Sequence, residues 1–277
     1  MAGELGVGII GGGVISGQYL DQFAQLEGVR AVAVADLDAA RAAQVAASCG
    51  ARAESVDELL ADPDADIVLN LTTPPFHAEV DRAVLAAGKH VYSEKPLALN
   101  LGDGRAILAQ AEQASLRVGC APDTFLGTGL QTTLAALQSG QIGTPFAASA
   151  FWSAPGHELW HPNPAFYYAP GGGPVLDMAP YYLTALVTHL GPVLRVRSSV
   201  LATGRERVVA TGPRAGEPIT VEVPTHATAI LEHAAGAVSS LTVSFEIWDS
   251  QHPKLEIYGT SGTLSLPDPN CFDGVGS

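Results

Sequence analysis

The stretch Gly8–Gly17, GIIGGGVISG, decides how the first part of this chain folds. It closes an apolar run, Leu5–Gly11, which predicts a buried strand, and it leads into Val14–Leu26, which predicts a helix. A strand, a glycine turn and a helix in this order are typical of a βαβ unit that binds a dinucleotide. The other interpretation is a glycine-rich turn with only a structural use.

The small residues of this turn fit the frame Gly11-x-Gly13-x-x-Ser16. Gly11 allows a tight turn, Gly13 lets the backbone approach a pyrophosphate, and Ser16 is small enough for the helix to pack on the strand. The N-terminus of the helix then faces the phosphates with its partial positive charge. We therefore expect a dinucleotide site at this turn.

An acidic residue in the right place extends the dinucleotide prediction. Asp36 stands 23 residues after Gly13 and ends the next apolar run, where a carboxylate can accept hydrogen bonds from a ribose diol. Asp38 follows closely, and two carboxylates would repel a 2′-phosphate, which favours NAD over NADP. Arg41 keeps NADP open, because an arginine can bind that phosphate.

Strand and helix signals alternate through the first 121 residues, which predicts an N-terminal Rossmann domain with a doubly wound parallel sheet. Its apolar runs are continuous, as expected for strands covered on both faces. Ser55 and Glu58 form a capping box that opens a short helix. The other predicted elements are strands at 5–11, 29–36, 66–72, 89–92 and 116–120 and helices at 14–26, 37–48, 76–87 and 101–114.

Residues 122–277 have a different pattern, which predicts a second domain of the α+β class with a large, open and mostly antiparallel sheet. Hairpin turns are expected at 236–237 and 261–262. The predicted helices are 127–138 and 175–190, separated by a strand at 144–152 and a loop at 153–170, and the later predicted strands are 195–202, 219–224, 227–234, 237–248, 254–260 and 263–267.

Composition excludes several classes of protein. Of 277 residues 47% are hydrophobic, and no apolar run approaches the roughly 20 residues that span a bilayer. A net charge of −14 disfavours nucleic-acid binding. The N-terminus lacks the basic start of a signal peptide. Three widely separated cysteines form neither a disulfide framework nor a metal motif, so we expect a cytoplasmic protein without a metal site.

Lysine is scarce in this chain, which draws attention to Lys95 in the stretch YSEKPLAL. Only three lysines occur, and this one follows an apolar strand between Glu94 and Pro96. Side chains at the carboxyl ends of parallel strands line the ligand crevice of a doubly wound sheet. The stretch TTPPFH, which ends with His77, follows another strand and is expected at the same edge. The alternatives are a solvated lysine and a histidine with a local hydrogen bond.

Several of these stretches together resemble the Gfo/Idh/MocA oxidoreductases. They are GIIGGGVIS (8–16), TTPPFH (72–77), AGKHVYSEKPLAL (87–99), QSGQIG (138–143) and GGGPVLD (171–177). The resemblance implies an NAD(P)-dependent dehydrogenase that acts on the CH–OH group of a sugar, polyol or diol. It also implies a homodimer or homotetramer that associates through the C-terminal sheet. The cofactor-binding residues it indicates are Gly11, Gly13, Val14, Ile15, Asp36, Thr72, Thr73, Pro74, His77, Glu94 and Lys95.

The resemblance also indicates catalytic residues, with one departure. The family pattern has a histidine four residues after the aspartate of the catalytic helix, and here Asp177 is followed by Tyr181. This is similar to the branch with glucose–fructose oxidoreductase and the dihydrodiol dehydrogenases, in which a tyrosine serves as acid and base. A nearby ammonium such as that of Lys95 favours the phenolate. Asp177, one helical turn before Tyr181, would orient Lys95 or bind substrate hydroxyls; the alternative for Tyr181 and Tyr182 is aromatic packing.

The loop before the catalytic helix holds the last candidates. His157, Trp160 and His161 can contact sugar hydroxyls by hydrogen bonds and stacking, or can simply pack on the edge of the domain. Two other functions stay open: a lyase or glycosidase of the same family that uses bound NAD for transient oxidation, and a catalytically silent NAD-binding protein. Relatives usually run some tens of residues longer, so the C-terminal domain is expected to be incomplete.

Overall fold

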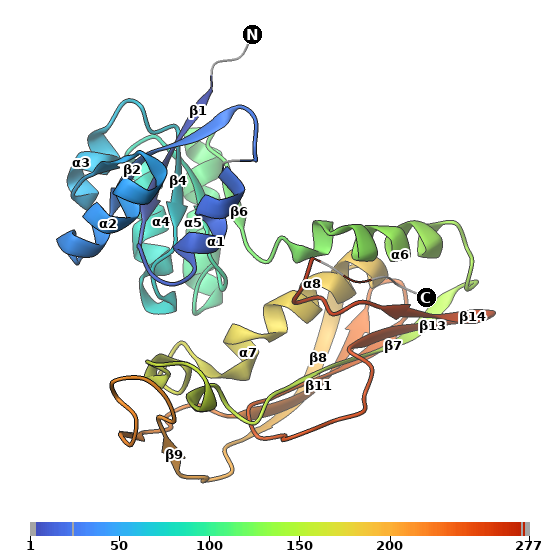
Figure 1. Ribbon diagram of the computed structural model, residues 1–277. Helices are drawn as coiled ribbons and strands as arrows, with labels where there is room; N and C mark the ends of the chain where they lie inside the picture. Colours follow the sequence, from blue (N-terminus) through green and yellow to red (C-terminus); the bar gives the residue numbers. More distant parts are fainter. Residues whose placement is uncertain (1–3, 24, 273, 275–277) are drawn as a thin grey trace. The chain divides into compact units, whose positions relative to one another are not determined.

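The structure, a computed structural model, describes residues 4–23, 25–272 and 274. The chain forms two compact units, Met1–Ala121 and Pro122–Ser277, each built on its own six-stranded sheet (Figure 1). Each unit has its own hydrophobic core, and each is described here by itself.

The first unit contains a fully parallel sheet in the order β3-β2-β1-β4-β5-β6, which we call sheet A. This is the strand order of a dinucleotide-binding Rossmann fold, so the predicted fold class is confirmed. In the register of the sheet, Ile10 pairs with Ala35 and with Asn70, and Asn70 pairs with Ser93. The strands are β1 (Leu5–Ile10), β2 (Val29–Ala35), β3 (Arg52–Ala53), β4 (Ile67–Asn70), β5 (His90–Ser93) and β6 (Val118–Cys120).

Helices connect the strands of sheet A, close to their predicted positions. Ser55 accepts a hydrogen bond from Glu58 N, and the Glu58 side chain accepts one from Ser55 N, so the capping box is confirmed. Lys89 is buried and donates to the carbonyls of Asp62 and Ala65, which fixes the chain that enters β4. The helices are α1 (Ser16–Phe23), α2 (Ala39–Cys49), α3 (Val56–Ala61), α4 (His77–Ala86) and α5 (Leu101–Ala114), with a 3-10 turn, η1 (Pro74–Phe76), before α4.

The second unit contains a mixed sheet in the order β14-β13-β7-β12-β11-β8, which we call sheet B. Four of its strand pairs are antiparallel and one, β7 with β12, is parallel, so a mostly antiparallel sheet is confirmed. The strands are β7 (Pro145–Ser153), β8 (Val193–Leu201), β11 (His226–His233), β12 (Val238–Ser244), β13 (Leu255–Gly259) and β14 (Gly262–Leu266), and β9 (Arg207–Val208) pairs with β10 (Pro218–Ile219) in a small ladder of its own.

Helices α6 (Thr128–Gln138) and α8 (Ala179–Leu190) pack on one face of sheet B (Figure 1). The helix predicted for 175–190 is in fact two helices, since α7 (Gly173–Asp177) ends before Met178 and α8 begins after it. Pro180 explains the break, because it has no N–H for the carbonyl of Leu176, four residues earlier, and its ring crowds that carbonyl.

One predicted strand, 219–224, was wrong. Only Ile219 of this stretch pairs in a ladder, and Glu222 N instead donates to the carbonyl of Tyr168 in the loop after β7. The alternation of apolar and polar residues correctly indicated an extended chain with one buried side. It could not indicate whether a strand would lie beside that chain.

Candidate active site

The glycine turn after β1 has the shape that the sequence predicted. Gly11 has φ +104°, and a Cβ there would lie 2.6 Å from the carbonyl oxygen of Leu71, so only glycine fits. A Cβ on Gly13, by contrast, would meet nothing within 4 Å, and this residue is exposed. Ser16 is buried, and its hydroxyl donates to the Gly13 carbonyl over 2.7 Å, which closes the turn onto α1.

Asp36 is held at the same edge of sheet A by the turn itself. Its Oδ2 accepts from Gly12 N and its Oδ1 from Asp38 N, both over 2.8 Å. Arg41 lies 3.5 Å from Oδ1 through its Nη1. The carboxylate therefore supports the glycine turn as well as standing where a ribose diol is expected, and the Arg41 cation already faces Asp36 and Asp38.

The loop after β4 is built around Asn70 and His77. Asn70 is fully buried: its Nδ2 donates to the His77 carbonyl and to Asp81, and its Oδ1 accepts from the backbone and hydroxyl of Thr72. The His77 ring is only 1% exposed, with Nδ1 2.7 Å from the Pro96 carbonyl and Nε2 2.8 Å from the Thr72 carbonyl. The imidazole links two loops and faces the interior of the unit.

Thr73 and Pro74 complete this loop, with Pro74 beginning the 3-10 turn η1 before α4. The next loop, after β5, carries Glu94 and Lys95. Glu94 accepts from the Tyr19 hydroxyl of α1 over 2.7 Å and from Lys95 N over 3.1 Å. Tyr19 therefore connects the helix that follows the glycine turn to the loop that contains the scarce lysine.

The first unit therefore presents groups that fit a nicotinamide dinucleotide. An open glycine backbone, the N-terminus of α1 with Val14 and Ile15 just before it, and a carboxylate at the end of β2 lie at one edge of a parallel sheet. The strand register places the loops that follow β4 and β5 at that edge as well. Within this unit the structure brings together the residues that the sequence indicated for the cofactor, although the His77 ring is turned inward.

In the second unit, Asp177 ends α7 and faces the loop after β7. His157 Nε2 lies 3.0 Å from Asp177 Oδ2, and Trp160 Nε1 donates to His157 Nδ1 over 3.2 Å. His157 is 6% exposed and Trp160 is 58% exposed. Burial, and then the charge of Asp177, raise the pKa of the nearby Tyr167 above its ordinary value. Asp177 thus lies among aromatic side chains, within hydrogen-bonding distance of His157.

The two tyrosines of α8 have different surroundings. Tyr182 is fully buried and its hydroxyl donates to Asp268 over 2.7 Å, while burial and then the charge of Asp268 raise its pKa. Tyr181 is partly buried at the edge of the core. Tyr182 is therefore a core residue, whereas Tyr181 is only partly buried.

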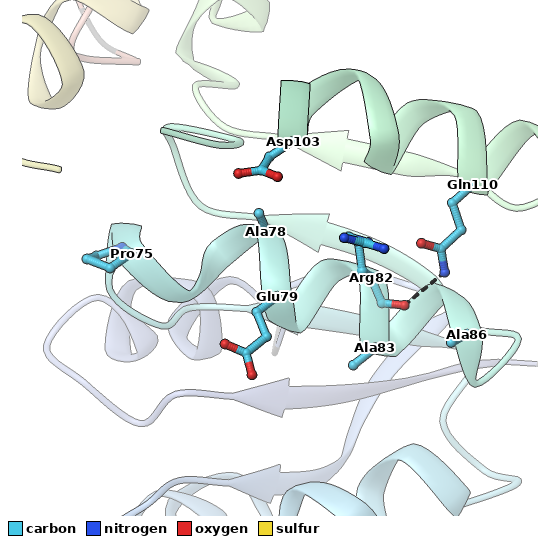
Figure 2. A pocket seen from close by; sticks show the side chains of 8 residues that line it. All are labelled: Pro75, Ala78, Glu79, Arg82, Ala83, Ala86, Asp103 and Gln110. Atoms are coloured by element: carbon cyan, nitrogen blue, oxygen red, sulfur yellow. Dashed lines mark hydrogen bonds between the residues drawn. The ribbon is translucent and has the colours of Figure 1, made fainter. Parts of the chain in front are cut away.

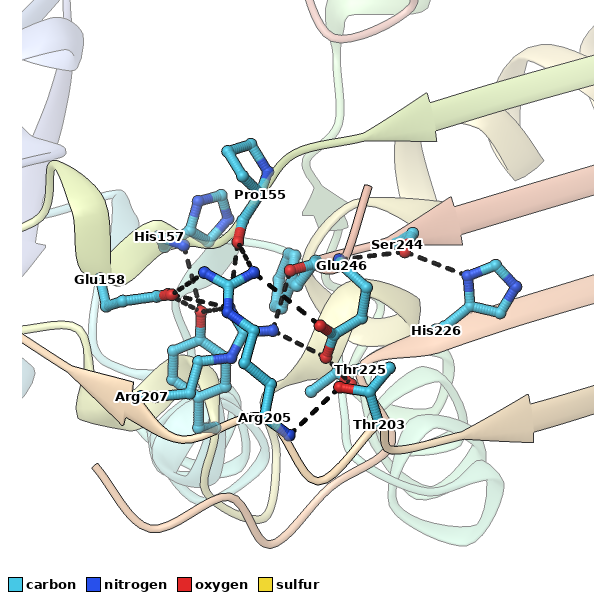
Figure 3. A network of polar contacts seen from close by, with 12 residues as sticks. Pro155, His157, Glu158, Thr203, Arg205, Arg207, Thr225, His226, Ser244 and Glu246 are labelled. Atoms are coloured by element: carbon cyan, nitrogen blue, oxygen red, sulfur yellow. Dashed lines mark hydrogen bonds and ion pairs between the residues drawn. The ribbon is translucent and has the colours of Figure 1, made fainter. Parts of the chain in front are cut away.

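A buried ion-pair cluster lies directly behind His157 (Figure 3). Arg207 donates to Glu158 over 2.7 Å and pairs with Glu246 at the same distance, and its side chain is fully buried. The Tyr168 hydroxyl donates to Glu158, and burial with this hydrogen bond raises the pKa of Tyr168. Gly156 has φ +129°, and a Cβ there would collide with Arg207 and Glu158.

Sequence reasoning did not identify this cluster. The available signal was Glu158, a glutamate beside the candidate His157 in the stretch GHELW. Its partner Arg207 lies 49 residues further along the chain. Nor did it identify Asn70, although an asparagine inside the apolar run DIVLNLT is a signal of the same kind.

Four further observations concern the described residues. A groove runs along α4 between Pro75 and Ala86, bordered by Glu79, Arg82 and Asp103 (Figure 2). His161 is partly buried, and burial lowers its pKa. Among residues 4–23, 25–272 and 274, no cluster of three or more His, Cys, Asp or Glu could hold a metal ion. No described helix is both long and apolar enough to cross a membrane.

Comparison with known proteins identifies the family. Residues 5–121 match the family model described as an oxidoreductase family with an NAD-binding Rossmann fold, and residues 130–265 match the Gfo/Idh/MocA C-terminal domain. The chain belongs to the Gfo/Idh/MocA oxidoreductase family. The resemblance inferred from the sequence motifs is thereby confirmed, and so is the expectation of an NAD-binding oxidoreductase.

Two curated relatives of this chain are named as a sugar reductase and a polyol dehydrogenase. The chain is 32% identical to a 1,5-anhydro-D-fructose reductase of Ensifer adhaerens over 62% of its own length and 52% of that protein's. It is 29% identical to an inositol 2-dehydrogenase of Pseudomonas fluorescens over 96% of its length and 75% of that protein's. It thus spans between about half and three quarters of these relatives.

The most informative solved structure is described as an NAD binding oxidoreductase from Klebsiella pneumoniae. It matches with a TM-score of 0.84 and 26% identity, over 97% of this chain and 74% of that one. A second, GenD2 from gentamicin A biosynthesis in complex with NAD, has a TM-score of 0.80 at 22% identity, over 95% of this chain and 72% of that one, and supports the fold alone.

Proposed function

We propose that the protein is an NAD(P)-dependent dehydrogenase that transfers a hydride between the CH–OH group of a sugar, polyol or diol and nicotinamide. The observation that carries the proposal is the open backbone at Gly13 beside the carboxylate of Asp36, on a chain whose relatives are named as sugar and polyol dehydrogenases and reductases. Those names include no lyase, glycosidase or silent binding protein, so the alternatives gain no support.

The cofactor would be held by the first unit. The backbone from Gly11 to Ile15 would receive the pyrophosphate, Asp36 the ribose, and the loops with Thr72, Thr73, Pro74, Glu94 and Lys95 the nicotinamide half. His77 would act indirectly, since its ring nitrogens already face two carbonyls. Bound nicotinamide supplies the hydride acceptor. We propose NAD as the preferred form because Arg41 is already paired with Asp36 and Asp38.

Proton handling would fall to three side chains. We propose that the Tyr181 phenolate takes the proton of the substrate alcohol and becomes the neutral phenol. The Lys95 ammonium would favour the phenolate, and Asp177 would bind a neighbouring substrate hydroxyl. Lys95 belongs to the first unit, and Tyr181 and Asp177 belong to the second. Trp160 and His161, which are more accessible than His157, would contact the rest of a polyhydroxy substrate.

The deciding experiment is a screen of sugars, polyols and diols with NAD and with NADP, following reduced nicotinamide. Turnover with NAD supports the proposal, and Tyr181→Phe should then reduce kcat at least about a thousandfold while the affinity for NADH stays the same, because the ring is kept and only the acid–base group is lost. Tyr182→Phe is the matched control, since this neighbour donates to Asp268 in the core. Full turnover in Tyr181→Phe would reject the assignment.

Two further properties belong to the same proposal. A homodimer or homotetramer would form through the face of sheet B opposite α6 and α8, where Leu201, Ile230 and Val238 are 48%, 47% and 43% exposed. A monomeric mass under native conditions would contradict this.

A cytoplasmic location fits the use of a nicotinamide cofactor and three cysteines without a disulfide, and export of the protein to the medium would exclude it.

A further inference from the structure

His157 has one ring nitrogen whose proton content is fixed by its neighbour. The indole N–H of Trp160 points at His157 Nδ1 over 3.2 Å, and an indole nitrogen can donate a hydrogen bond but cannot accept one. Nδ1 must therefore offer a lone pair. A doubly protonated ring would set an N–H against the indole N–H, so this contact favours a neutral histidine.

The other ring nitrogen then has a defined role. With Nδ1 bare, the single proton of the ring resides on Nε2, which lies 3.0 Å from Asp177 Oδ2. The histidine is a donor and the carboxylate an acceptor, and the side chains of His157 and Asp177 are only 7% and 14% exposed. Indole, imidazole and carboxylate thus form a chain of hydrogen bonds that runs in one direction.

The surroundings hold this ring in place. Tyr167 and Phe245 pack against it with ring centroids 4.4 and 4.5 Å away. Behind it, the backbone N–H of His157 donates to the Tyr168 hydroxyl, which in turn donates to Glu158 of the ion-pair cluster (Figure 3). The turn that carries His157 is therefore anchored on buried charge, and rotation of the ring is hindered by aromatic neighbours.

We propose that Trp160 and His157 are positioning residues which fix Asp177 as an oriented, ionised hydrogen-bond acceptor for a substrate hydroxyl. This rests on the proposed function of Asp177. In this arrangement His157 accepts a hydrogen bond from Trp160 and donates one to Asp177. Trp160 acts from the exposed side by holding the tautomer, and its ring remains accessible for a substrate. The loop 153–170 thus orients the aspartate in addition to any contact it makes with a sugar.

The first test is nitrogen-15 NMR of the histidine side chains in the full chain at neutral pH, where bare and protonated ring nitrogens have well-separated resonances. We expect His157 to show a bare Nδ1 and a protonated Nε2. Trp160→Phe keeps the aromatic ring but removes the N–H, and it should introduce the other tautomer or a second proton. Trp248→Phe removes another exposed indole and should change nothing. A protonated Nδ1 in the wild type, or an unchanged His157 in Trp160→Phe, would overturn the tautomer lock.

The second test compares two replacements of the histidine. His157→Leu removes the donor, and kcat should fall about a hundredfold, as expected when a substrate-binding group is misplaced by about an ångström. His157→Gln offers an amide N–H near the position of Nε2 and should recover about tenfold of that loss, equivalent to roughly one hydrogen bond to a charged group. Tryptophan fluorescence and NADH affinity establish that both variants are folded. Equal kcat in wild type and His157→Leu would overturn the positioning role.

A readout without turnover separates this inference from the proposed dehydrogenase activity. The carboxyl carbon-13 resonance of Asp177 should shift in His157→Leu and return towards the wild-type position in His157→Gln. An unmoved resonance overturns the inference whatever the substrate screen shows. If the resonance moves but no sugar, polyol or diol is oxidised, the hydrogen-bond chain stands and the proposed substrate class fails.

Discussion

His77 in the first unit and His157 in the second are both almost fully buried, yet their hydrogen-bond partners demand opposite charge states. Both ring nitrogens of His77 face carbonyl oxygens, which only accept, so only an imidazolium satisfies both contacts. His157 faces one donor and one acceptor, which a neutral ring satisfies. Burial alone therefore does not decide whether a histidine is charged; the donor or acceptor character of the two atoms beside its ring does.

The pKa values of two carboxylates, Asp81 in the first unit and Glu246 in the second, also depend on the partners of each group. Burial raises the pKa of Asp81, and its hydrogen bond from Asn70 and the charge of His77 oppose this only in part. Glu246 is also subject to burial, but its hydrogen bonds from Thr225 and Arg207, with the charge of Arg207, bring its pKa below the ordinary value. The hydroxyl of Thr225 and the guanidinium of Arg207 together make the difference.

Removal of that arginine should have the largest effect. Arg207→Met removes the fully buried cation that pairs with Glu158 and Glu246 and leaves them only the partly exposed Arg205. Breaking a buried pair in this way costs about 3–5 kcal/mol. The change should appear as a lower denaturant midpoint in tryptophan fluorescence. All three tryptophans, Trp152, Trp160 and Trp248, belong to the second unit, so this signal reports on that unit alone.

A neighbouring arginine provides the control. Arg205 also binds Glu158 and the carbonyl of Pro155, but its side chain is 26% exposed, and Arg205→Met should cost about 1 kcal/mol. Adding Glu158→Gln to Arg207→Met should restore part of the loss, because one of the two buried carboxylates that lost Arg207 is then neutral. If both arginine variants lose the same free energy of unfolding, the buried ion pairs of Arg207 contribute no more to stability than the partly exposed ones of Arg205.

The next largest effect is expected when the hydrogen bonds of the His77 ring are removed. His77→Leu removes both hydrogen bonds of the ring and should destabilise the first unit by about 2–3 kcal/mol. NADH binding should also weaken, because the loops after β4 and β5 lose their link. His77→Gln retains one donor and should lie between wild type and His77→Leu. Amide hydrogen exchange in peptides from these loops measures the change.

The protonation itself can be observed directly. In nitrogen-15 NMR at neutral pH, both ring nitrogens of His77 should carry protons. His90 of the same unit is the reference, because its Nδ1 accepts from Arg117 N over 2.9 Å and must be bare. A bare nitrogen on His77 would remove the contrast with His157, since both rings would then be neutral.

Sequence patterns predicted the fold better than they predicted these contacts. Continuous apolar runs and the glycine frame indicated the parallel sheet correctly, because these signals are local and each strand carries its own. The break between α7 and α8 at Met178 was not predicted, although Pro180 is a local signal for it. The cluster around Arg207 could not be predicted, because its members lie in the loop after β7, in β9 and beyond β12, and only the folded chain brings them together.

The candidate site shows the same limit. The positions of Gly11, Gly13 and Asp36 followed from spacing along the chain, since a turn between a strand and a helix fixes its own geometry. The partners of His77 and His157 did not. A sequence names a histidine but not the atoms that will face its ring, so the inward position of His77 and the hydrogen bond from His157 to Asp177 required the structure.

The pH dependence of stability gives the smallest and most discriminating test. The folded pKa of Glu246 is lowered, so its contribution is present above the ordinary value of about 4.3 and is lost as the pH falls through the lowered value. The folded pKa of Asp81 is raised, so its burial costs stability at neutral pH, and this cost disappears as the pH falls through the raised value towards about 4. The two carboxylates should therefore give slopes of opposite sign.

Glu246→Gln and Asp81→Asn isolate the two slopes. The difference in unfolding free energy between wild type and Glu246→Gln, followed by tryptophan fluorescence, should shrink in acid, because the wild-type carboxylate is then protonated as well. The difference between wild type and Asp81→Asn, followed by amide exchange in α4, should shrink as the pH falls through the raised pKa towards about 4, with the variant as the more stable protein at neutral pH. A less stable Asp81→Asn would mean that the carboxylate is worth more as the counter-charge of His77 than its burial costs, and the first unit would then resemble the second in depending on a buried ion pair.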